Sequence, residues 1–321
     1  MSAITTRRTR QRPPAPDEQV DHEIKPGDYF GTTSSKGGQV WYFDGSKAVR
    51  AGVPNPDYRS MATVEPGETL RDALARVPMF ASETFILHRM VLPPGAYYPR
   101  IARPVDQHPD DVPSGRWEPG SADVLVGTLN QVRSLVGMLD AIFQAVHPSA
   151  ANMSCFGSAT RNLIILACTE CEAQWRGVLL AHSYSAARLK TDDYVKLMPA
   201  MRLGEYQVKL QHFPWLPAIA PYSGWEASAP TQTLPWYDDY NAVKHDREAS
   251  FERATLENAI SSVAAVWVMI AAQFGVHGVR EFDDLSRYFH LASVPRWRYS
   301  DAYTYGYDGF NSEAGARKYP F

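Results

Sequence analysis

The side chains best suited to chemistry lie together in the stretch WYDDYNAVKHDR, residues 236–247. Asn241 and His245 are four positions apart, so in a helix they project from one face, and Lys244 and Arg247 flank the histidine. An imidazole that titrates near neutrality can exchange protons, while an amide and two cations can stabilise the charge on a phosphodiester. The pattern predicts a phosphate-handling site in which His245, Asn241 and Arg247 are catalytic and Lys244 binds phosphate.

A structural interpretation of the same residues stands beside this one. Asn241 and His245 would then bond to a loop carbonyl or to water near the start of a helix, with Lys244 and Arg247 on a solvated surface. A single histidine in a stretch of mixed charge is more often of this second kind. The residue pattern alone leaves both interpretations open.

The stretch resembles the motif of the HEPN superfamily of small helical bundles, which are usually dimeric. Many of them are metal-independent endoribonucleases of toxin, anti-phage defence or RNA-processing systems. Their motif is an arginine, then a polar residue such as asparagine, then a histidine four to six residues after the arginine. Asn241 and His245 match its last two positions, and RNLIILACTECEAQW, with Glu170 and Glu172, looks like the second helix of such bundles. The resemblance implies RNA as partner, a homodimer, and no cofactor.

The chain departs from this motif five residues before His245, where Tyr240 stands in place of the arginine. Tyrosine is neutral and has one hydroxyl instead of five N–H donors. Losing one such contact to a phosphate typically lowers the rate by about 100- to 1,000-fold. Two functions remain open: RNA binding or cleavage, with Tyr240 and Glu172 as further RNA-binding residues, or a catalytically inactive module that binds a partner or has a structural role.

The sequence CTEC, residues 168–171, has the CxxC spacing of some metal and redox sites. Both cysteines fall on the same helical stripe as Ile164 and Trp175, where cysteine packs as a small apolar residue. A tetrahedral zinc site would need two further ligands. We therefore predict two core cysteines and no metal site.

Arg161 and Asn162 form another polar pair, at the start of the same predicted helix. If that helix lies beside the stretch 236–247, Arg161 or Glu172 can approach His245. The commoner alternative is that Arg161 and Asn162 are ordinary surface residues of a first helical turn. The sequence has no Walker loop, GxGxxG, GxSxG or HExxH motif. Their absence excludes the common nucleotide-binding, hydrolase and metalloprotease classes.

Apolar periodicity predicts the helices that position these residues, with long ones at 121–147, 158–189 and 239–274 and shorter ones at 191–201 and 280–293. The first apolar stripe comprises Leu125, Leu129, Val132, Val136, Leu139, Phe143 and Val146, and the second Ile164, Cys168, Cys171, Trp175, Val178 and His182. We predict a mainly α fold, an up-and-down helical bundle (HEPN-like) over residues 121–286 with a small α+β N-terminal region.

Residues 26–101 contain short apolar runs separated by Gly and Pro, which predict that α+β region. Asp-Gly at 44–45 predicts a hairpin between Val40 and Val53. The run TFILHRMVL predicts a strand at 84–92, and GETLRDALARV predicts a short helix at 67–77. The remaining segments are predicted to be a disordered tail (1–25), a linker or surface loop (102–120) and an aromatic-rich tail that packs on the bundle (287–321).

The overall composition limits the partners and the compartment. A net charge of -3 gives no general attraction to nucleic acid, so a phosphate-binding surface must be local. Residues 259–276 are uncharged, but charged residues lead directly into them and Ser261, Ser262 and Gln273 interrupt them, which predicts a buried helix and no membrane span. Three cysteines and no signal-peptide pattern predict the cytoplasm.

Overall fold

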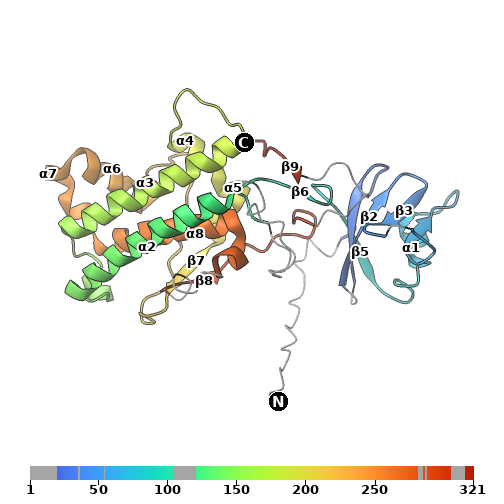
Figure 1. The fold of residues 1–321 in the computed structure, drawn as a ribbon, viewed down its shortest axis with the longest axis horizontal. Helices are drawn as coiled ribbons and strands as arrows, with labels where there is room; N and C mark the ends of the chain where they lie inside the picture. The colour runs from blue at the N-terminus through green and yellow to red at the C-terminus, as the bar shows by residue number, and fades with distance from the viewer. Residues whose placement is uncertain are drawn as a thin grey trace, which may run out of the picture. The chain divides into compact units, whose positions relative to one another are not determined.

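The computed structural model describes residues 20–34, 37–53, 55–103, 121–280, 285, 288–304 and 315–321. Contacts divide the chain into two units, one holding the chain up to Pro94 together with Arg298–Ala302, and the other built around Gly95–Trp297 (Figure 1). Most of the predicted N-terminal tail and of the predicted linker lies outside the described residues.

The N-terminal unit contains a five-stranded antiparallel sheet in the order β4-β3-β2-β1-β5, with the helix α1 (Figure 1). The predicted hairpin, the strand at 84–92 and the short helix are confirmed. Thr69 caps α1 by accepting a hydrogen bond from the backbone N–H of Asp72. The bounds are β1 Tyr29–Ser34, β2 Gly37–Phe43, β3 Lys47–Arg50, β4 Met61–Thr63, α1 Leu70–Ala75 and β5 Phe85–Arg89.

This sheet has an apolar core of its own, in which Phe30, Trp41, Leu74 and Phe80 are almost completely buried. The ring of Tyr299, from the far end of the chain, lies over β1 and β2. A methyl group at Gly31 or Gly38 would overlap it. Glycine is required at these two positions because only a residue without a Cβ lets an aromatic ring approach the backbone so closely.

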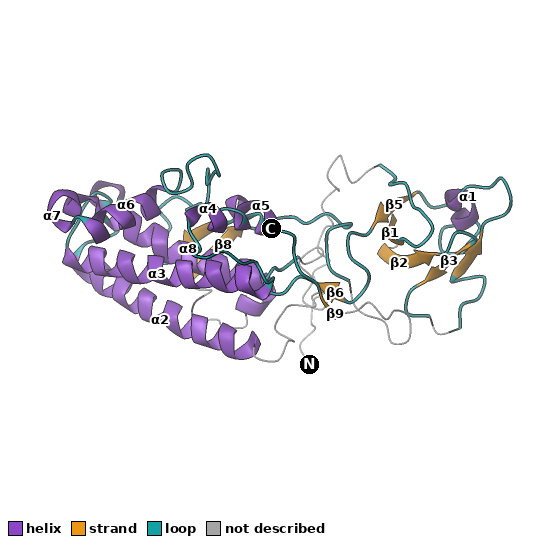
Figure 2. Ribbon diagram, turned by 90° about the horizontal axis from the view of Figure 1, so that it is seen from above, coloured by secondary structure: helices purple, strands orange, loops and turns teal. Residues whose placement is uncertain are grey.

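The second unit is arranged around three long helices, α2 (Ser121–Ala145), α3 (Ser158–Ala181) and α8 (Leu256–Arg280), which lie alongside one another (Figures 1 and 2). The apolar stripes predicted for the first two helices point inward. Every residue of the second stripe is buried, while Val136, Phe143 and Val146 of the first are half-buried. By length and composition alone α8 could cross a membrane, but 89% of its most apolar window is buried inside the protein. The predicted buried helix is therefore confirmed.

Short elements fill the chain between and around these helices. They are β6 Ala96–Tyr97, η3 Ala150–Asn152, α4 Thr191–Tyr194, α5 Leu197–Met201, η4 Leu203–Glu205, β7 Gln207–Leu210, α6 Pro235–His245, α7 Arg247–Ser250, η5 Phe251–Arg253, β8 Phe289–Ser293 and β9 Gly315–Ala316, where η marks a 3-10 helix. β7 pairs with β8 antiparallel, and β6 pairs with β9 parallel.

Several predicted helix bounds are wrong. The helix predicted at 158–189 ends at Ala181, and that at 191–201 is two short helices, α4 and α5. The helix predicted at 239–274 is divided among α6, α7, η5 and α8. Of the helix predicted at 280–293, residues 289–293 form β8, because pairing with β7 overrides the local helical pattern.

The predicted fold class, a mainly α up-and-down helical bundle, is wrong. The described chain is a mixed α/β protein in which the antiparallel sheet forms the N-terminal unit with its own core. The long helices share their unit with two small sheets and several short helices. The prediction failed because it treated the sheet as a flanking region and joined short helices into one long helix.

The close packing of the Tyr299 ring on Gly31 predicts that a methyl group added at this position destabilises the fold. Gly31→Ala should lower the free energy of unfolding by about 1–3 kcal/mol, because the new methyl group overpacks against the ring. Chemical denaturation measures this, with Gly127→Ala in α2, where a methyl group meets open space, as the control. In the Tyr299→Ala background the same substitution should cost clearly less, and an equal cost in both backgrounds would contradict the explanation.

Candidate functional site

The predicted site residues lie on α6, but at its end and not near its start. Pro235 occupies the first turn, where a missing N–H costs nothing, and the helix ends at His245. The next residue, Asp246, leaves the helical conformation with φ -133° and ψ 83°, and its carboxylate accepts the N–H of Ala249 at 3.0 Å. The predicted start near Asp239 is wrong because α6 begins at Pro235, and the helix does not continue past His245 because Asp246 caps α7.

One face of α6 is buried against α3. Tyr237 and Tyr240 are 4% and 1% exposed, and the ring centroids of Tyr237 and Trp175 are 5.2 Å apart. The hydroxyl of Tyr237 donates to Oε1 of Glu172 at 2.7 Å. Burial first, then this hydrogen bond, raises the pKa of Tyr237 far above its ordinary value, so the phenol stays a donor to the carboxylate.

Both ends of α6 are also held by charged side chains. Arg161 of α3 donates from Nε and Nη2 to the carbonyl oxygen of Val243, at 3.2 and 3.1 Å. Near the start, Arg253 forms ion pairs with Asp238 and Asp239. Arg161 thus contacts α6 two residues before His245, and its guanidinium lies at the negative end of the helix dipole.

A pocket of about 630 Å³ opens beside the exposed face of α6. Its residues come from three regions that are far apart in sequence: α3, residues 188–194 with α4, and α6 with the loop before it. They are Glu172, Arg188, Leu189, Lys190, Thr191, Asp192, Tyr194, Ser228, Ala229, Pro230, Thr231, Gln232, Tyr237, Asn241, Lys244 and His245.

The pocket wall carries more cations than carboxylates. Arg188, Lys190 and Lys244 line the pocket together with Glu172 and Asp192, and all three cations are exposed. Lys244 donates from Nζ to the hydroxyl of Tyr240 at 2.7 Å. This hydrogen bond is the main reason why the pKa of Lys244 is raised. The ammonium group of Lys244 is therefore charged at neutral pH.

The predicted site residues divide into three groups. Glu172, Asn241, Lys244 and His245 line the pocket, although the Nδ2 of Asn241 donates to the carbonyl oxygen of Tyr237 at 3.0 Å. Tyr240 is buried beneath the pocket and contacts Lys244 instead of the open space. The side chain of Arg247 lies outside the described residues, and its backbone belongs to α7.

Sequence reasoning missed the wall opposite α6. Arg188, Lys190 and Thr191 come from a polar stretch, RLKTDD, that carried no motif. The hydroxyl of Thr231 hydrogen-bonds to the hydroxyl of Thr191 at 3.3 Å, which joins the two loops of this wall. The many charged residues of RLKTDD could have marked it as a candidate binding segment. No sequence spacing, however, predicts that it lies near α6.

The two cysteines of CTEC are completely buried, as predicted for core residues. Cys168 and Cys171 are both 0% exposed, and burial is the main cause that raises the pKa of each thiol well above its ordinary value. Within the described residues no group of His, Cys, Asp or Glu side chains is arranged to hold a metal ion.

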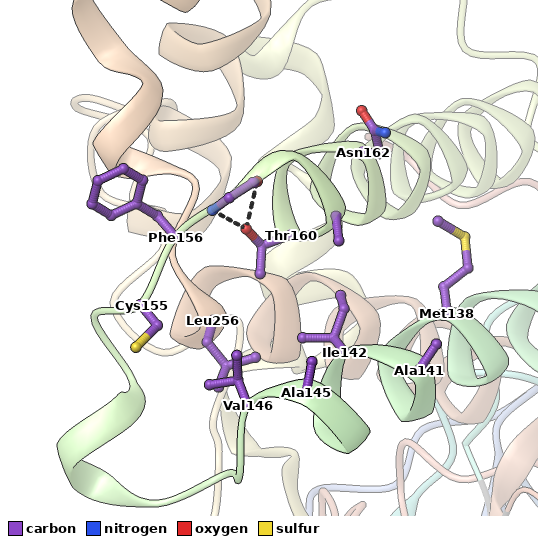
Figure 3. Close-up of a pocket in the computed structure, with 12 residues that line it drawn as sticks. Met138, Ala141, Ile142, Ala145, Val146, Cys155, Phe156, Thr160, Asn162 and Leu256 are labelled. Atoms are coloured by element: carbon purple, nitrogen blue, oxygen red, sulfur yellow. Dashed lines mark hydrogen bonds between the residues drawn. The ribbon is translucent and has the colours of Figure 1, made fainter.

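A second pocket, of about 440 Å³, has a different character (Figure 3). Side chains from α2, among them Ile142 and Ala145, project toward the start of α3 above them, and none of the described residues that line the space is charged. Its buried hydroxyl, on Thr160, is already bonded to Gly157 and to the carbonyl oxygen of Ala254. Asn162 lines this pocket, so Arg161 and Asn162 do not act as one polar pair.

Comparisons of the chain with family models, with curated proteins and with solved structures give no match. The resemblance to the HEPN superfamily therefore stays a prediction based on the stretch 236–247 and on the second-helix segment.

The hydrogen bond between α6 and α3 leads to a prediction about stability. Tyr237→Phe keeps the ring against Trp175 but removes the donor to Glu172, and should lower the free energy of unfolding by about 1–3 kcal/mol. Denaturation followed by tryptophan fluorescence measures this. Tyr58→Phe is the matched control, because Tyr58 is 65% exposed and its loss should cost under about 0.5 kcal/mol. Equal effects of the two substitutions would contradict a structural role for the Tyr237–Glu172 bond.

Proposed function

We propose that the pocket beside α6 binds the sugar–phosphate backbone of RNA and that His245 takes part in metal-independent cleavage in the cytoplasm. One observation carries the proposal. Glu172 and the end of α6 come from distant parts of the sequence, yet they line one pocket with Asn241, Lys244 and His245. Two exposed cations, Arg188 and Lys190, line the same pocket, and that charge suits a phosphodiester.

Cleavage of RNA without metal needs two proton transfers and stabilisation of charge on phosphorus. One group takes the proton of the ribose 2′-hydroxyl, whose oxygen then attacks the adjacent phosphorus. Another group protonates the departing 5′-oxygen, which leaves a 2′,3′-cyclic phosphate and a free 5′-hydroxyl. His245 and Glu172 are the proton-exchanging residues of the pocket that suit these roles, and Lys244 stabilises the charge. One N–H of the Asn241 amide is bonded to Tyr237, and the second N–H orients the phosphate.

A second function, binding without cleavage, is favoured by the position of Tyr240. Its hydroxyl is buried and bonded to Lys244, so it does not replace the arginine that the HEPN motif has at this position. The protein would then be an inactive module that holds a phosphate-bearing partner. The homodimer that the resemblance implies is part of both proposals, and is tested by light scattering.

The proposed chemistry predicts the effect of removing one imidazole. Purified protein incubated with mixed single-stranded RNA and EDTA should release fragments with cyclic phosphate ends, and His245→Ala should lower the rate by about 100-fold or more. His290→Ala is the matched control, because His290 is an exposed histidine on β8 outside the pocket.

Three outcomes are distinct in this experiment. Loss of cleavage in His245→Ala alone supports the nuclease proposal. Equal RNA decay with both variants attributes the activity to a contaminant and removes the catalytic role of His245. RNA binding that weakens in Lys244→Ala, with no fragments from any protein, supports the binding module instead.

A further inference from the structure

The wall of the pocket opposite α6 depends on one tyrosine that does not line it. Tyr184 donates from its hydroxyl to Oδ1 of Asp193 at 2.6 Å. The other oxygen of Asp193 accepts the backbone N–H of Lys190 at 2.9 Å. Asp193 therefore links Tyr184 to Lys190, which lines the pocket.

This link is important because the wall has little secondary structure of its own. α4 spans only Thr191–Tyr194, and an isolated turn of helix is unstable in water. Contacts from outside α4 therefore fix its position: the ring of Tyr194 packs on Trp175 with centroids 5.4 Å apart, Thr231 bonds to Thr191, and Tyr184 bonds to Asp193. The Tyr184 bond is the main cause that lowers the pKa of Asp193, which keeps the carboxylate ionised as an acceptor.

Tyr184 is held in turn by the segment 315–321. The ring of Phe321 meets the ring of Tyr184 edge to face, with centroids 6.3 Å apart and an interplanar angle of 87°. Lys196 donates from Nζ to the Tyr184 hydroxyl at 2.8 Å. The tyrosine is thus fixed at its ring by Phe321 and at its hydroxyl by Lys196 and Asp193.

The segment 315–321 is itself attached along its length. The N–H of Arg317 donates to the carbonyl oxygen of Tyr97 at 2.8 Å, and the N–H of Tyr319 donates to Nδ1 of His182 at 3.0 Å. Burial lowers the pKa of His182 to about 4, so its ring is neutral and can accept this bond. The ring of Phe321 also packs on His182, with centroids 5.4 Å apart.

We infer that Tyr184 is a positioning residue for the pocket and that Phe321 holds Tyr184 in place. The link runs from Phe321 through Tyr184 and Asp193 to Lys190. The claim that this link strengthens ligand binding rests on the proposed function. The claim that it fixes the position of residues 188–195 does not. Substitutions at Tyr184 and Phe321 therefore act on the pocket without contacting the ligand.

Hydrogen exchange of the backbone amides in 188–195, followed by mass spectrometry without ligand, tests the inference directly. Tyr184→Phe keeps the ring against Phe321 but removes the hydroxyl, and Phe321→Ala removes the supporting ring. Each should speed exchange in this segment by about 5- to 30-fold, with exchange in α2 unchanged. Lys318→Ala, an exposed residue of the same segment, is the control and should exchange like the wild type.

A second measurement concerns the ligand and uses a short fluorescent single-stranded RNA. Both variants should bind it about fivefold more weakly than the wild type, because Lys190 is less well placed. Unchanged exchange in both variants would overturn the inference, and so would faster exchange with unchanged RNA affinity. If the wild type binds no RNA, the proposed function fails, and the exchange data still decide whether Tyr184 positions the wall.

Discussion

The packing of α6 on α3 is the constraint on which the candidate site depends. Successive residues of a helix are rotated by about 100°, so burying one face fixes the direction of every other side chain. Tyr237 and Tyr240 are buried, and Asn241, Lys244 and His245 consequently line the pocket. The bond between Tyr237 and Glu172 sets how far α6 lies along α3, and so brings a carboxylate to the same space.

The charges of the site are local and come from separate elements. The net charge of -3 offers no general attraction for RNA, yet three exposed cations line this one pocket. Lys244 is held by Tyr240, while Arg188 and Lys190 belong to a short segment that is bonded to Tyr184 and to Thr231. Contacts from both walls would strengthen phosphate binding, because each charge-assisted hydrogen bond adds to the others and a less solvated charge is less screened.

Sequence periodicity predicted the buried stripes, as Trp175 and Cys171 show, and helical spacing placed Asn241 and His245 on one face. The end of α6 was not predictable, because Asp246 fits a helix as well as it fits a cap until its backbone conformation is known. The wall opposite α6 was also missed. Its residues come near α6 only through tertiary packing between segments far apart in the chain, and no local pattern encodes that. The same reason explains the strand at 289–293, which exists through its pairing with β7.

The central claim is that His245 and its neighbours on α6 form one RNA-binding pocket, and NMR of the histidine imidazoles tests it most directly. The ligand is a short RNA with 2′-methoxy groups, which cannot be cleaved because the attacking hydroxyl is blocked. The signals of His245 should shift and saturate on titration, those of His290 should not move, and Lys244→Ala should weaken the response. Binding of the RNA with His245 unperturbed and shifts confined to another surface would contradict the account.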